Sequence, residues 1–235
     1  MPRPKFRTMF QDKKDWPETI KHLIWMEEHT CNQHGVAYSH HPNCFIREQP
    51  DSKHTAKIAF LDIETTGLDA DWDVMTCYCL KPAGGKIIED IITKEEIQDF
   101  HRLDKRIVSS VIQAISKFDV VVAHYGNGFD LPFMRTRAVY WDIPFPNHKA
   151  IFQADTWKIA KSKLKMSRNG LENLNNLIRG KTSKTRLNFE MKWKVLTGSK
   201  EGLRYIIDHC RRDTVMLEQL YDRIKGFVPD PRTSI

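Results

Sequence analysis

The segment FLDIETTGL at residues 60–68 constrains the fold most, because it places two carboxylates where a buried strand ends. Asp62 and Glu64 are two residues apart, so on an extended strand their side chains project from the same face. Leu61 and Ile63 supply the buried face. Two adjacent acids repel each other unless a cation lies between them. The segment is therefore either a solvated strand end or part of a metal site, and acids elsewhere in the chain decide between the two.

The chain as a whole has the size and composition of a globular α/β protein. Its 235 residues allow one α/β core and a modest additional module. No apolar stretch approaches the ~20 residues of a membrane span, and the N-terminus lacks the apolar core of a signal peptide. These features predict an intracellular, cytoplasmic protein without a membrane partner.

Positive charge is concentrated in one segment, residues 158–194. It holds eleven Lys and Arg residues against two acids, a net charge of +9, while the whole chain carries +7 and the remainder therefore −2. Trp157 and Trp193 lie at its edges. Such a segment is typical of a surface that contacts phosphates, with a solvated basic loop as the alternative.

From residue 57 onward the apolar patterns predict the order β-β-β-α-β-α-β-α. In chain order, the predicted strands are 57–64, 72–81, 85–93, 119–124 and 151–157, and the predicted helices are 93–118, a helix from 130, and 199–227. Thr93 and Glu96 form a capping box at the start of the first of these helices. The order predicts an antiparallel meander extended by parallel strands, with helices on the faces of the sheet. Residues 1–56 lack a strand pattern, apart from a helix predicted at about 17–28.

Two further acids favour a metal site over a solvated strand end for Asp62 and Glu64. Asp130 follows the fourth strand in HYGNGFDLPFM, and Asp213 lies in the last helix, one turn after His209, so that both project from one helical face. Four carboxylates around one point require divalent cations. Two Mg²⁺ or Mn²⁺ ions roughly 3.5–4 Å apart would neutralise them and stabilise the attacking and leaving oxygens of a phosphodiester. His209 is then placed to hold or deprotonate the attacking water.

The motifs DIETTGL, NGFDLPF and HCRRD resemble, in the same order, the three exonuclease motifs of the DEDD superfamily of 3′→5′ exonucleases, over residues 57–227. The resemblance implies a ribonuclease H-like fold and a two-metal phosphodiester hydrolase. It implies that the metal ligands are Asp62, Glu64, Asp130 and Asp213, and that His209 acts on the water. It also implies that Asn127 lies near the substrate and that Thr65, Thr66 and Gly67 border the terminal nucleotide.

The last motif departs from the family pattern. One branch has Tyr four residues before the final Asp, and another has His five residues before it. Here His209 occupies the position of the Tyr, four residues before Asp213, and Asp208 occupies the position of the His, five residues before it. Tyr205 is a weaker candidate for the same role, and Asp155 is interpreted as structural or as a neighbour of the metal ligands.

The N-terminal region contains a second candidate metal site. Cys31-x-x-His34 and His41-x-x-Cys44 are two ligand pairs separated by a short loop, a spacing that is plausible for structural zinc. His29 and His40 compete with His41 for the fourth position, and an ordinary reduced loop is the alternative. Cys77, Cys79 and Cys210 are predicted to be buried thiols.

The sequence thus predicts an N-terminal extension (1–56), an exonuclease domain (57–228) and a C-terminal tail (229–235). The expected substrate is a single-stranded end, DNA more than RNA, and the expected partner is a separate polymerase or another replication or repair protein. A bacterial or phage source is weakly indicated. The alternatives are an exoribonuclease, a non-catalytic nucleic-acid-binding adaptor and a structural protein. The residues expected to guide the strand are Trp157, Lys161, Lys163, Lys165 and Arg168.

Overall fold

The computed structural model describes residues 18–32, 34–41, 44–45, 57–147, 150–179, 189–227 and 233–234. The chain separates into two compact units, Met1–Ala56 and Lys57–Ile235. Each unit is described by itself. Part of the basic segment, residues 180–188, and most of the expected C-terminal tail lie outside the described residues.

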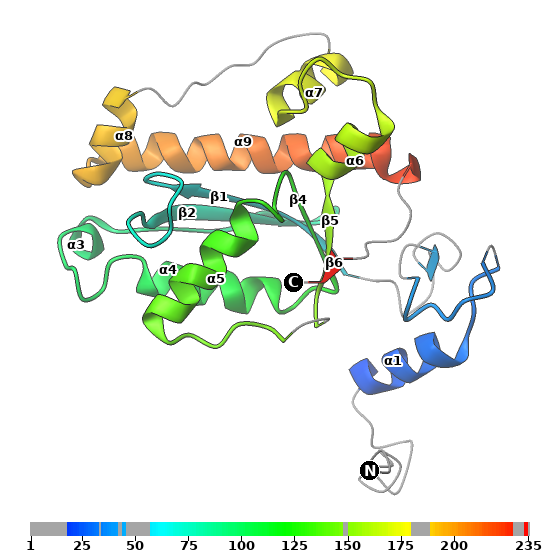
Figure 1. Ribbon diagram of the computed structural model, residues 1–235. Coiled ribbons are helices and arrows are strands. Elements are labelled where there is room, and N and C mark those ends of the chain that lie inside the picture. The colour runs from blue at the N-terminus through cyan, green and yellow to red at the C-terminus, as the bar shows by residue number, and fades with distance from the viewer. Residues whose placement is uncertain are drawn as a thin grey trace, which may run out of the picture. The chain divides into compact units, whose positions relative to one another are not determined.

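The larger unit is built on a mixed sheet with the strand order β3-β2-β1-β4-β5-β6 (Figure 1). Its first three strands form an antiparallel meander, β4 and β5 extend the sheet in parallel from β1, and β6 pairs antiparallel with β5. The strands are β1 (Ile58–Thr65), β2 (Met75–Pro82), β3 (Ile88–Ile91), β4 (Val120–Ala123), β5 (Phe152–Asp155) and β6 (Thr233–Ser234). The predicted fold class, a meander plus parallel strands flanked by helices, is confirmed. The two-residue strand β6 has no signal in the sequence.

Helices cover both faces of this sheet. In chain order they are α3 (Lys94–Ile97), α4 (Lys105–Ile115), α5 (Asp130–Trp141), α6 (Thr156–Lys163), α7 (Leu171–Arg179), α8 (Phe189–Leu196) and α9 (Lys200–Ile224), followed by the 3₁₀ turn η3 (Lys225–Phe227). Figure 1 shows α9 lying along one face, with α4 and α5 on the other. Among the described helices, none is long and apolar enough to cross a lipid bilayer.

The alternation of β1 decides which of its side chains faces which layer. Ala59, Leu61 and Ile63 join the main hydrophobic core with residues of α4 and α5. On the opposite face, the ring of Phe60 packs edge-on against Tyr221 of α9, with ring centroids 5.8 Å apart. Because successive strand residues point to opposite faces, the acids at positions 62 and 64 share the face of Phe60. The strand therefore directs its carboxylates toward α9.

The helix predicted over 93–118 is wrong in one respect, because the structure divides it into α3 and α4. The predicted capping box of Thr93 and Glu96 is confirmed at the start of α3. The chain then turns through residues 98–104, with Leu103 in a left-handed conformation at φ 29°. The turn carries Asp104 into the interior, where its carboxylate accepts hydrogen bonds from the backbone of Met75 and from Arg137 and Trp141. These long-range contacts outweigh the local helical pattern.

The smaller unit contains α1 (Glu18–Glu28) and an isolated antiparallel bridge between Thr30 and Ala37. Its buried cluster is small and consists of Met26, Cys31, Tyr38, Cys44 and Phe45, with Trp25 packed against it.

Replacing Asp104 by Ala should destabilise the larger unit by about 3–5 kcal/mol, because it leaves the charge of Arg137 buried without its partner. The side chains of Asp104 and Arg137 are 0% and 3% exposed. Chemical denaturation measures the change. Asp99→Ala is the matched control and should have a much smaller effect, since Asp99 pairs with Arg102 at the surface, where ion pairs contribute little to stability. Equal losses in the two variants would contradict the assignment of Asp104 as an interior anchor.

Candidate active site

Four carboxylates from three elements converge beside the C-terminal end of β1. Asp62 and Glu64 come from β1, Asp130 is the first residue of α5, and Asp213 lies on α9. The Cys210 thiol, on the buried side of α9, donates to the backbone carbonyl of Asp62 at 3.3 Å. Electrostatic repulsion from Glu64, Asp213 and Asp130 acts on Asp62. The fold therefore brings together acids from three segments that are far apart in the sequence.

Burial raises the pKa of all four acids, and repulsion from the other acids of the site adds to the shift for Asp62 and Glu64. The pKa of Asp62 is raised well above its ordinary value, mainly by burial and then by the three neighbouring acids. For Glu64, burial and the charges of Asp213 and Asp130 raise the pKa to about 8, although Lys192 opposes the shift. Burial also raises the pKa of Asp130 to about 7, against backbone N–H groups of Asp130 and Ile63 that donate to its carboxylate. Asp213 shows a raised pKa for the same first reason, burial.

His209 lies between two of these acids. Its Nε2 atom is 3.5 Å from Oε1 of Glu64 and 3.8 Å from Oδ2 of Asp213. Asp208, which occupies the other branch's position, instead pairs with Arg211 at 2.5 Å. Of the two motif positions that distinguish the branches, the one occupied by His209 thus lies within 4 Å of the carboxylates.

The residues present fit divalent metal ions. Oδ2 of Asp62 is buried and has no hydrogen-bond partner among the described residues, although a carboxylate oxygen in such a place is costly to leave unpaired. Cations would relieve the repulsion that contributes to the raised pKa values of Asp62 and Glu64. Carboxylate oxygens suit Mg²⁺ or Mn²⁺ better than zinc.

A pocket opens beside the acids on the side of α8. Glu64 and the turn that follows β1 form one wall, and α8 forms another. Its lining includes Thr65, Thr66, Gly67, Phe129, Lys192, Val195 and Leu196. The three turn residues expected near a terminal nucleotide therefore lie together at this pocket. Gly67 also has a packing reason, because a Cβ there would lie 2.4 Å from the Asp73 carboxylate, which accepts a hydrogen bond from Thr66.

Asp155 organises the loop that leads into α5. Its carboxylate accepts hydrogen bonds from the backbone N–H groups of Tyr125 and Asn127, and it caps α6 through Trp157 and Lys158. This supports the structural interpretation of Asp155. The same bonds join the loop carrying Asn127 to the helix carrying Trp157.

Two aromatic side chains lie where the loop before α5 meets α6. The rings of Tyr125 and Trp157 meet edge-on with centroids 4.9 Å apart, and the Lys161 ammonium lies 4.7 Å from the Trp157 ring centroid. Tyr125 is 46% exposed and adopts a positive φ of 61°, a conformation that costs a bulky residue energy and is often found at functional sites. A Cβ on Gly128 would collide with the Tyr125 ring, so the glycine makes room for it.

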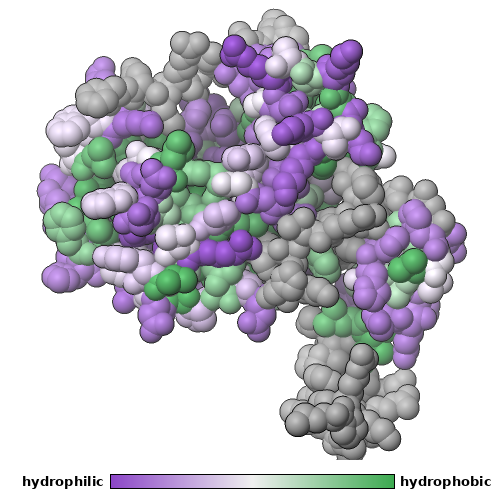
Figure 2. Space-filling model, in the orientation of Figure 1, coloured by the Kyte–Doolittle hydropathy of each residue, from purple (hydrophilic) through white to green (hydrophobic). Residues whose placement is uncertain are grey.

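The basic side chains expected to guide a strand are exposed on α6 and the turn after it. Lys161, Lys163, Lys165 and Arg168 are all solvent-accessible. In the described part of the chain, the last three form no ion pair with an acid. Figure 2 shows hydrophilic residues gathered over the upper part of the larger unit, where Figure 1 places α6 and α7.

Sequence patterns missed two residues of this region. Lys192 lies within the basic segment, but no pattern singles it out as the lysine that faces Glu64. Tyr125 is adjacent to the predicted Asn127, and its strained backbone and its contact with Trp157 appear only in the folded chain. The sequence offered only a basic residue in one case and an aromatic residue near a motif in the other. Such a residue is a weak indication of a functional position by itself.

In the smaller unit, the fold gathers Cys31, His34, His41 and Cys44, whose ligand atoms all lie within 4.8 Å of one another. This Cys/His cluster could bind zinc. The two other histidines considered for the fourth ligand position make different contacts. His29 Nδ1 contacts the Trp25 carbonyl oxygen, and His40 lies 3.9 Å from Glu27. Cys77, Cys79 and Cys210 are buried, as predicted.

Residues 59–225 match the family model described as the RNase_H superfamily. The chain belongs to this superfamily. Membership supports nuclease activity in general and a nucleic-acid substrate. No curated protein sequence matches this RNase H superfamily chain.

Among solved structures, the chain is similar to the family B DNA polymerase from the hyperthermophilic archaeon Pyrobaculum calidifontis, with a TM-score of 0.60 and 16% sequence identity. The match covers 72% of this chain and 24% of the polymerase. At this identity the similarity concerns the fold, and it spans about a quarter of the polymerase's length.

The stability of the metal-free protein should fall as pH rises from about 5 to 8. The folded state holds protons on Glu64 and Asp130 up to pKa values of about 8 and 7, whereas the unfolded chain releases them near 4.5 and 3.8. The folded state therefore binds more protons in this window, and raising the pH favours unfolding. Thermal melts in EDTA across the range measure the slope.

Glu64→Gln should flatten that slope, because it removes one of the titrating groups. Mg²⁺ or Mn²⁺ should flatten it as well, because a bound cation favours the ionised carboxylates. Asp208→Asn is the control outside the cluster and should keep the slope of the unaltered chain. A pH-independent melting temperature in EDTA would contradict the clustered arrangement of the acids.

Proposed function

We propose that the chain is a metal-dependent 3′→5′ exonuclease that hydrolyses phosphodiester bonds at single-stranded ends, DNA more than RNA. The observation that carries the proposal is the convergence of Asp62, Glu64, Asp130 and Asp213 on one point, where Asp130 is buried and the other three are half-buried, with His209 between two of them. Buried like charges are costly, so their convergence needs a reason, and divalent cations supply one. The direction of cleavage rests on the resemblance of the three motifs to DEDD exonucleases.

The four carboxylates are the proposed metal ligands. Two bound Mg²⁺ or Mn²⁺ ions would supply Lewis-acid stabilisation for the attacking and leaving oxygens of the phosphodiester. His209, whose imidazole lies beside Glu64 and Asp213, would hold the attacking water and accept its proton. Lys192, which faces Glu64, would place a positive charge beside the phosphate.

The surroundings suggest how an end would be positioned. The pocket formed by Thr65, Thr66 and Gly67 opens directly beside Glu64 and would receive the terminal nucleotide. On the loop that precedes Asp130, Asn127 would contact the substrate, and Trp157 would offer a stacking surface for a base. The cations of α6 and of the turn after it would contact the phosphates upstream. The similarity to a DNA polymerase favours DNA and is compatible with a separate polymerase as partner.

Two alternatives are decided by the same assay. An exoribonuclease would use the same carboxylates, since the choice of sugar depends on the space beside the 2′-hydroxyl. A non-catalytic adaptor would bind strands without cutting them, but it would have no need for four carboxylates that repel one another.

Asp62→Ala and Asp213→Asn should each lower cleavage more than about 100-fold, because the loss of an outer-shell metal partner alone typically costs 10–100-fold. The assay uses single-stranded DNA and RNA labelled at the 5′ end or the 3′ end, with Mg²⁺, Mn²⁺ or EDTA. A ladder of 5′-labelled fragments that shorten stepwise indicates cleavage from the 3′ end. Asp208→Asn, on the same helix as Asp213, should keep its activity. Undiminished turnover in Asp62→Ala with Mn²⁺ would refute the two-metal assignment.

Neutralising the cations of α6 and of the turn after it should weaken strand binding and reduce its dependence on salt. The slope of log affinity against log salt should fall by roughly 0.7 for each phosphate contact that is lost on a single strand. The variant combines Lys161→Gln, Lys163→Gln, Lys165→Gln and Arg168→Gln, in a background that binds but does not cleave. Lys117→Gln together with Lys105→Gln, on and just beyond α4, is the control. An unchanged slope in the first variant would show that the segment faces away from the strand.

A further inference from the structure

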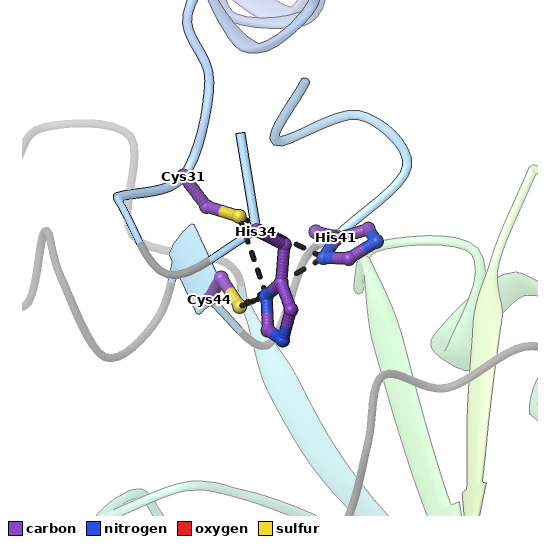
Figure 3. Close-up of side chains that lie close together, drawn as sticks. All are labelled: Cys31, His34, His41 and Cys44. Atoms are coloured by element: carbon purple, nitrogen blue, oxygen red, sulfur yellow. Dashed lines mark hydrogen bonds between the residues drawn. The ribbon is translucent and has the colours of Figure 1, made fainter. Parts of the chain in front are cut away.

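The Cys/His cluster has the dimensions of a tetrahedral metal site. The sulfur of Cys31 lies 3.5 Å from Nδ1 of His34 and 3.7 Å from Nδ1 of His41, and the sulfur of Cys44 lies 3.4 Å and 3.9 Å from the same two atoms (Figure 3). In a tetrahedral zinc site, Zn–S bonds of ≈ 2.3 Å and Zn–N bonds of ≈ 2.0–2.1 Å place sulfur and nitrogen about 3.6 Å apart. The four separations lie around that value.

The first ligand pair lies on a tight hairpin. The Cys31 N–H donates to the Val36 carbonyl at 2.9 Å, and the Gly35 N–H donates to the Cys31 carbonyl at the same distance. Gly35 adopts a φ of 65°, which glycine tolerates without strain. Backbone N–H groups of Val36 and His34 also point to the Cys31 sulfur, where they would stabilise a thiolate. The backbone therefore holds Cys31 in a form suited to bind a cation.

The second pair lies on a short helical turn. The N–H groups of Cys44 and Phe45 both donate to the His41 carbonyl, at 2.9 and 3.2 Å. This turn brings the side chains of His41 and Cys44 to one side. The rings of His34 and His41 meet edge-on with centroids 4.9 Å apart, and both present Nδ1 to the two sulfurs.

Among the described residues of the N-terminal unit, little apolar packing surrounds the four ligands. Cys31 and Cys44 are 1% and 0% exposed. They are two of the five residues that form the buried hydrophobic cluster described for this unit. Modules of this size usually need a metal, a disulfide or a partner to fold. The same buried residues that pack against Tyr38 and Phe45 are the ones that present the sulfur ligands.

We propose that Cys31, His34, His41 and Cys44 bind one structural zinc ion, with both histidines coordinating through Nδ1, and that this ion stabilises the N-terminal unit. The proposal goes beyond the nuclease function and does not depend on it. Two thiolates and two imidazoles prefer zinc to the hard cations of the carboxylate site. With four protein ligands the site is closed, which is typical of structural rather than catalytic zinc.

The test measures bound metal and not nuclease activity. The full chain is expressed with added zinc, dialysed extensively against metal-free buffer that removes weakly bound ions, and analysed for metal content. We expect about one zinc per chain in the unaltered protein and in the control His40→Ala, whose side chain is exposed beside Glu27. His34→Ala and Cys44→Ser should lose the ion under the same dialysis, and their N-terminal units should melt at lower temperature.

A second measurement on the unaltered chain avoids variants that fail to fold. Replacing zinc by Co²⁺ should give the visible absorption bands of tetrahedral cobalt, together with a charge-transfer band from sulfur. Absence of both zinc and these bands would overturn the proposal. So would an equal loss of zinc from His40→Ala and His34→Ala.

Discussion

Mutual repulsion among four carboxylates, one buried and three half-buried, is the constraint on which the larger unit depends. Asp62 and Glu64 share the face of β1 that turns toward α9, and Asp213 on that helix and Asp130 at the start of α5 approach the same point. Burial and repulsion together raise the pKa of Glu64 to about 8. A fold that gathers these charges must hold them by other forces, and divalent cations are the natural counter-charge.

Those other forces are buried contacts around the acids. The core under β1 packs Leu61 and Ile63 against α4 and α5, while the thiol of Cys210 anchors α9 to the backbone of Asp62. Asp155 fixes the loop before α5 by accepting its backbone N–H groups. The repelling acids are therefore positioned by elements that are stable for independent reasons, which lets the site remain arranged before a substrate arrives.

The N-terminal unit also gathers potential metal ligands, but of a different chemical type. Its buried cluster is small, and its polar side chains converge as soft ligands, two thiols and two imidazoles, rather than as carboxylates. Thiolate and imidazole select zinc, whereas carboxylate oxygens select magnesium or manganese. The chain thus carries two clusters suited to different cations, one proposed for chemistry and one proposed for folding.

The sequence by itself determined the fold class, the meander, the Thr93 capping box and the close grouping of Cys31, His34, His41 and Cys44, because strand alternation and short-range spacing are local properties. Only the tertiary structure decided three other features. The break between α3 and α4 depends on Asp104 reaching Arg137 in another helix. The facing of Lys192 toward Glu64 and the strained conformation of Tyr125 against Trp157 likewise join segments far apart in the chain. Contacts between distant segments leave no periodic trace in the sequence, so they become visible only when the chain has folded.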